Sequence, residues 1–113
     1  MPYMDNMPLF RKLAIAARMQ SSEVKISKSG FYGRSNLDAK QAYRTVTEIL
    51  GQHDMVLDQR WTKVIGGNRI IIGQCFSMVD QYIIYFVFTE CGAGTFVSVS
   101  GVDYSDEEGW DHE

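Results

Sequence analysis

From Met55 onward, apolar and polar side chains alternate with a period of two, the pattern of a β-strand. Four such runs follow one another, at residues 55–65, 69–79, 82–90 and 95–102. Short connections of glycine and polar residues separate the runs, and connections of this length join neighbouring antiparallel strands. The second half of the chain therefore predicts a four-stranded antiparallel meander.

The first part of the chain predicts a helix, a short strand and a loop. Residues 9–19 have helical spacing of their apolar side chains, which indicates a short amphipathic N-terminal helix. Its apolar stripe consists of Phe10, Leu13, Ala14 and Ala17. Residues 24–27 alternate like a short strand, and residues 29–33, with two glycines, are interpreted as a loop.

A second amphipathic helix is the clearest single element. Its apolar stripe repeats with a period of about 3.6 residues: Ala39, Ala42, Tyr43, Val46, Ile49 and Leu50. Ser35 or Asn36 is the expected N-cap, and Asp38 falls in the first turn. Gly51 stands where a left-handed residue would end the helix.

The order of these elements resembles that of cystatin-like and NTF2-like α+β folds, in which a sheet curls around one helix. The inhibitory loops of cystatins have no counterpart in this sequence, so the resemblance implies a fold and no function. We expect residues 1–102 to form one α+β domain and residues 103–113 an acidic, disordered tail.

The connections at residues 66–67, 80–81 and 91–94 set a register for the predicted sheet. In this register one row crosses all four strands: Gln59, Gln74, Val87 and Ser98. Apart from Asp58 and Arg60 near one edge, one face is uniformly apolar and is assigned to the helix-packed core. Its members are Val56, Val64, Ile71, Cys75, Ile84, Phe86, Phe88, Val97 and Val99.

The opposite face combines large apolar side chains with a few polar ones. We select as candidate ligand or interface residues Gln59, Trp61, Ile72, Gln74, Phe76, Tyr85, Phe96, Ser98 and Ser100. Because the run at residues 82–90 is apolar on both sides, this face needs a cover. The candidates are the N-terminal helix, a second subunit, or a ligand in a concave apolar site.

Composition narrows the class of protein further. The chain has 113 residues, 45% of them hydrophobic, and its longest apolar run, residues 82–88, is far short of a membrane span. The start of the chain lacks a secretory pattern, so we expect a cytoplasmic protein.

Cys75 and Cys91 are too far out of step on adjacent strands to form a disulfide. No spacing typical of a metal, cofactor or catalytic site is present, so none is expected.

Charge is distributed unevenly along the chain. Residues 1–50 hold eight Lys and Arg against four Asp and Glu, whereas residues 51–113 hold three against ten. The basic segment 25–34 interleaves cations with aromatics, as single-stranded nucleic-acid sites do; its candidate contacts are Lys25, Lys28, Tyr32 and Arg34. In the tail, Trp110 stands among carboxylates. This composition is typical of short docking peptides, and it is equally typical of a solvated chain end.

Three functions follow from these patterns. The first is a non-enzymatic binding protein that acts through protein contacts, as a homodimer or as an inhibitor or adaptor of another macromolecule. The alternative is a small-molecule-binding or isomerase-like domain with a pocket on the second sheet face. The third is nucleic-acid binding through residues 25–34. The net charge of −3 makes a nucleic-acid partner less favourable than a protein partner.

Overall fold

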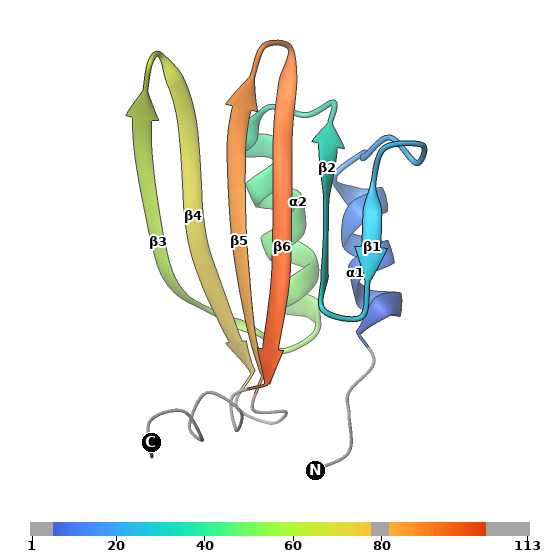
Figure 1. Cartoon of the computed structure of the whole chain (residues 1–113). Coiled ribbons are helices and arrows are strands. Elements are labelled where there is room, and N and C mark those ends of the chain that lie inside the picture. Colours follow the sequence, from blue (N-terminus) through green and yellow to red (C-terminus); the bar gives the residue numbers. More distant parts are fainter. Residues whose placement is uncertain (1–5, 78–81, 104–113) are drawn as a thin grey trace, which may run out of the picture.

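The computed structural model describes residues 6–77 and 82–103 and confirms the predicted α+β class. The elements in chain order are α1 (Met7–Ala16), β1 (Lys25–Ser27), β2 (Gly30–Ser35), α2 (Ala39–Gln52), β3 (Val56–Ile65), β4 (Asn68–Ser77), β5 (Tyr82–Cys91) and β6 (Gly94–Asp103). The strands form one antiparallel sheet in the order β1-β2-β6-β5-β4-β3 (Figure 1). The predicted meander is thus present, and β2 and β1 extend it beyond β6.

Both helices pack on the same side of this sheet (Figure 1). Their apolar stripes and the sheet share one buried core, which includes Phe10, Leu13, Phe31, Val46, Leu50, Ile84, Phe86, Phe88, Val97 and Val99. The ring of Phe10 in α1 lies 5.9 Å from the ring of Phe31 in β2, measured between centroids. Of the three candidate covers for the second sheet face, the N-terminal helix is excluded, because its apolar stripe is already buried beside α2.

The segment 29–33 was predicted to be a loop; Ser29 does lie in a turn, but residues 30–33 belong to the strand β2. Phe31, Gly33 and Ser35 of this strand face the helices and are buried. The strand was missed because glycine and serine occupy two of its three core positions, and these residues give no apolar alternation.

α1 begins and ends earlier than the predicted range 9–19. Pro8 lies in its first turn, where a missing backbone N–H costs no helical hydrogen bond. The helix stops at Ala16, and Arg18 then takes a left-handed conformation with φ of 55°. The hydroxyl of Ser35 donates a hydrogen bond to the carbonyl of Ala17, which ties this end of α1 to the end of β2.

The ends of α2 also differ from the prediction. The N-cap is Asp38, whose carboxylate accepts a hydrogen bond of 2.8 Å from the backbone N–H three residues later. Ser35 and Asn36, the predicted caps, precede it. Gly51 continues the helix, and the left-handed residue after the helix is Asp54, with φ of 61°.

β3 and β4 pair in the predicted register from Ile65 back to Gln59. Between Leu57 and Gln59 the register shifts, which is the mark of a β-bulge. Two β3 residues assigned to the core, Val56 and Val64, are exposed by 62% and 67%. The bulge moves Val56 to the other face, and Val64 lies next to the last residue of β3, at the edge of the sheet.

The pairing of β4 with β5 is shifted by two residues from the predicted register. Gln74 lies opposite Tyr85 instead of Val87. The reason is that β4 ends at Ser77 and β5 begins at Tyr82, and these two residues pair with each other. The connection is therefore four residues long and not two. A shift of two keeps every side chain on its predicted face, so the predicted faces of both strands are correct.

β5 and β6 pair in the predicted register, with Val87 opposite Ser98. Their connection is shorter than predicted, since Cys91 and Gly94 form the last pair. Gly92 between them has a φ of 63°, which a two-residue hairpin turn requires.

Candidate binding surface

The face of the sheet turned away from both helices is here called the open face (Figure 1). The residues selected from the sequence as ligand or interface residues occupy strand positions of this face. Its central row holds one residue from each strand: Trp61, Ile72, Val87, Ser98, Tyr32 and Lys25. The row on one side holds Lys63, Ile70, Thr89, Phe96 and Arg34. The row on the other side holds Gln59, Gln74, Tyr85, Ser100, Gly30 and Ser27.

The third of these rows corrects the predicted line of polar residues. Gln59 does oppose Gln74, but the row continues through Tyr85 and Ser100 and not through Val87 and Ser98. The cause is the two-residue shift between β4 and β5. Gln74 and Tyr85 are half-buried, whereas the side chain of Gln59 lies outside the described part of the molecule.

One half of the open face, formed by β3, β4 and β5, is mainly apolar. We call it the apolar half and define it by Val56, Trp61, Ile65, Ile70, Ile72, Phe76, Ile83 and Val87. Exposure is greatest along β3, where Trp61 is 50% and Ile65 is 59% exposed. Val64, on the helix side of the same strand, is also exposed, so β3 presents apolar side chains to both sides.

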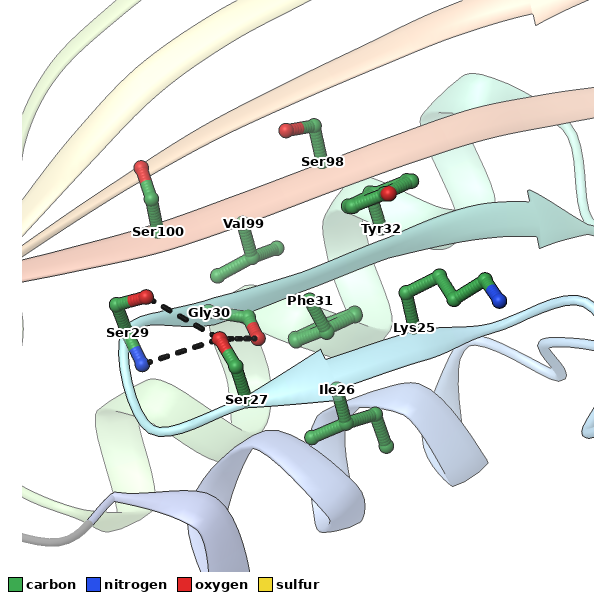
Figure 2. A pocket seen from close by; sticks show the side chains of 10 residues that line it. All are labelled: Lys25, Ile26, Ser27, Ser29, Gly30, Phe31, Tyr32, Ser98, Val99 and Ser100. Carbon is green, nitrogen blue, oxygen red and sulfur yellow. Dashed lines mark hydrogen bonds between the residues drawn. The ribbon is translucent and has the colours of Figure 1, made fainter.

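The other half, formed by β1, β2 and β6, is polar and basic. We call it the basic half and define it by Lys25, Ser27, Tyr32, Arg34, Phe96, Ser98 and Ser100. An open groove of about 390 Å³ lies here, and Figure 2 shows the hydroxyls, the Tyr32 ring and the Lys25 chain around it. Its polar lining comes from Lys25, Ser27, Ser29, Tyr32, Ser98 and Ser100.

One wall of the groove is organised by the turn between β1 and β2. The Ser27 hydroxyl lies 3.1 Å from the Ser29 hydroxyl, accepts from the Ser29 backbone N–H at 3.3 Å and donates to the Gly30 carbonyl at 3.3 Å (Figure 2). Gly30 is needed here because a Cβ would overlap the Val99 carbonyl. Ser27 and Ser29 were not selected from the sequence, although the pair Ser29 and Gly30 is typical of a turn.

In two cross-strand pairs of the basic half, a cationic residue lies opposite an aromatic residue. Lys25 lies opposite Tyr32, and Arg34 lies opposite Phe96. The Tyr32 and Phe96 rings are 6.2 Å apart between centroids, tilted by 41°, and 52% and 43% exposed. Within the described ranges neither Lys25 nor Arg34 makes an ion pair, although an Arg34 N–H donates to the Cys91 sulfur at 3.6 Å.

The remaining predicted residues lie elsewhere. Lys28 is in the turn between β1 and β2 and does not line the groove, and Trp110 lies outside the described residues with the rest of the tail. The two cysteines form no disulfide: Cys75 is buried in the core and Cys91 lies at the end of β5.

Two general features of the described ranges bear on the class of site. In residues 6–77 and 82–103, no group of three His, Cys, Asp or Glu side chains is placed to hold a metal ion. Neither helix in those ranges has the length and apolar content needed to cross a lipid bilayer.

No family model, no curated protein and no solved structure matches this chain. The resemblance to cystatin-like and NTF2-like folds thus remains one of element order.

Proposed function

We propose that this protein is a non-enzymatic binding domain that associates with a second copy of itself through the apolar half of its open face. The observation that carries the proposal is the exposure of β3. This strand is ten residues long, lies at the edge of the sheet, and presents Trp61, Ile65 and Val64 to solvent from both of its sides. Long apolar edge strands promote pairing with another chain unless something covers them.

A second copy suits this surface because the same apolar strip is present on both molecules. A twofold axis places a patch against its own copy, so a strip that is mainly apolar, with Lys63 as its charged member, can still be complementary to itself. Tryptophan at the centre of such a contact is among the side chains that dominate binding energy. Arg60 stays on the helix side, where its guanidinium lies 5.2 Å from the centre of the Tyr43 ring, and so leaves the apolar half without this charge.

Light scattering coupled to gel filtration at micromolar concentrations tests the proposal. We expect a species of twice the chain mass of 12.9 kDa. Trp61→Thr, which keeps a β-forming residue in the strand, should weaken association at least tenfold. Ile15→Gln is the matched control, because Ile15 is also exposed but lies on α1, and it should leave the dimer intact. A single 12.9 kDa species at every concentration would exclude self-association.

A further inference from the structure

We propose that the basic half of the open face binds single-stranded nucleic acid, with bases stacked on Tyr32 and Phe96 and phosphates at Lys25 and Arg34. The basic half is separate from the apolar half, so nucleic-acid binding at the basic half does not depend on self-association.

The geometric basis is the pairing of each ring with a cation. Directly opposed residues of an antiparallel pair have Cβ atoms about 4.5–5.5 Å apart. Lys25 and Arg34 therefore start beside the rings of Tyr32 and Phe96, and their long flexible chains reach the solvent next to those rings. A stacked base beside a neutralised phosphate is the repeating unit of single-strand recognition.

The state of the two rings fits this role. Both are about half exposed although they contact each other, so each still has side-chain surface accessible to a base. At 6.2 Å and 41° the rings do not stack on one another and leave no room for a base between them. The bases would therefore lie on the outer surface of the rings, one over each, as on an open platform.

The groove next to Tyr32 supplies the polar partners. The hydroxyls of Ser98 and Ser100 have no hydrogen-bond partner among the described residues, and both line the groove with Lys25 (Figure 2). Hydroxyls and an ammonium group bind phosphate and sugar oxygens. A volume of about 390 Å³ is in the range of pockets that accommodate small ligands.

Charge favours an anionic occupant at this half of the face. Among acidic residues whose side chains are described, Asp38, Glu48 and Asp54 belong to α2 or its ends. Glu90 forms an ion pair with Arg69 at 3.8 Å, and Glu23 lies in the turn before β1. No described carboxylate therefore occupies a strand position of the open face, where Lys25 and Arg34 stand.

Fluorescence anisotropy of the full chain with labelled oligo(dT) and oligo(U) of ~12 nucleotides at ~50 mM salt tests the proposal. We expect binding whose affinity falls with salt. Tyr32→Thr and Phe96→Thr should each weaken binding about tenfold, whereas Tyr32→Phe should keep it. Lys25→Gln and Arg34→Gln should each weaken binding and lower the slope of log affinity against log salt by about 0.7.

Matched controls come from the helix side of the molecule. Lys40→Gln and Arg44→Gln remove exposed charges of the same kinds from α2 and should change affinity less than twofold. Thermal melts confirm that each variant is folded. Absence of any anisotropy change with the unaltered chain overturns the proposal, as does equal binding of a duplex or of polyglutamate, because neither probe offers unstacked bases. Trp61→Thr should leave nucleic-acid binding intact, which separates this result from the outcome for self-association.

Discussion

An added methyl group is expected to have opposite effects at two glycines of this fold. Gly51 lies in the last turn of α2 with no atom within 4 Å of the position of a Cβ, so Gly51→Ala should raise the free energy of unfolding by about 0.5–1 kcal/mol. At Gly94, the first residue of β6, a Cβ would overlap the backbone carbonyl oxygen of Ser35, which cannot rotate away. Gly94→Ala should therefore lower the free energy of unfolding by about 1–3 kcal/mol. Urea denaturation of both variants measures these changes. A loss of stability in Gly51→Ala would mean that this residue takes the left-handed conformation expected from the sequence alone.

Two buried hydroxyls hold four elements together at one end of the sheet. Ser35 donates to the Ala17 carbonyl and accepts from the Leu37 backbone N–H at 3.0 Å, while Thr95 donates to the Leu37 carbonyl at 2.7 Å. Both side chains are fully buried, so removing either one leaves buried backbone groups unpaired. Ser35→Ala and Thr95→Val should each lower the free energy of unfolding by about 1–3 kcal/mol in urea titrations. Ser22→Ala, in an exposed turn, is the control and should stay within about 0.5 kcal/mol of the unaltered chain.

The same elements show what apolar patterning can and cannot predict. Alternation identifies β3 to β6 and, apart from the bulged start of β3, their faces, because a residue on the wrong face would put polar groups in the core. Alternation does not distinguish two registers that differ by two residues, and this is why the row through Gln74 was predicted to continue at Val87 and not at Tyr85. Sheet width was also underestimated, since β2 packs its core positions Gly33 and Ser35 through close backbone approach and not through large side chains.

The residues of the candidate surface could be predicted from the sequence, but their arrangement on the sheet could not. Trp61, Phe96, Tyr32 and Lys25 were all selected from the sequence, but as members of two unrelated features, an apolar sheet face and the basic segment 25–34. They share one face only because β2 pairs with β6, a contact between residues 30–35 and 95–100 that no local pattern encodes.

At the scale of the whole molecule, charge is divided between the sheet and the end of the chain. Lys25 and Arg34 lie on the open face, whereas six of the chain's fourteen acidic residues fall between Asp103 and Glu113. β6 connects the two regions, because Ser100 lines the groove and Asp103 ends the same strand. Three residues of β-strand span ~10 Å, which is about the Debye length at 0.1 M salt. The strand that carries Ser100 therefore ends ~10 Å from the groove, at the residue where the acidic segment of the sequence begins.

Neutralising part of that acidic segment should therefore strengthen binding of single-stranded nucleic acid. The variant Asp106→Asn/Glu107→Gln/Glu108→Gln keeps the full chain and removes three negative charges. We expect the affinity for oligo(dT) to rise about threefold to tenfold at ~50 mM salt and the gain to disappear near ~0.5 M, where screening is short-ranged. Glu23→Gln/Glu48→Gln/Asp54→Asn changes the net charge by the same amount at turns and on α2, away from the open-face strand positions, and serves as the control. If both triple variants strengthen binding equally, net charge alone is responsible and the segment after Asp103 has no special influence on the groove. If the first variant binds more tightly than the second, the acidic segment competes with nucleic acid for Lys25 and Arg34.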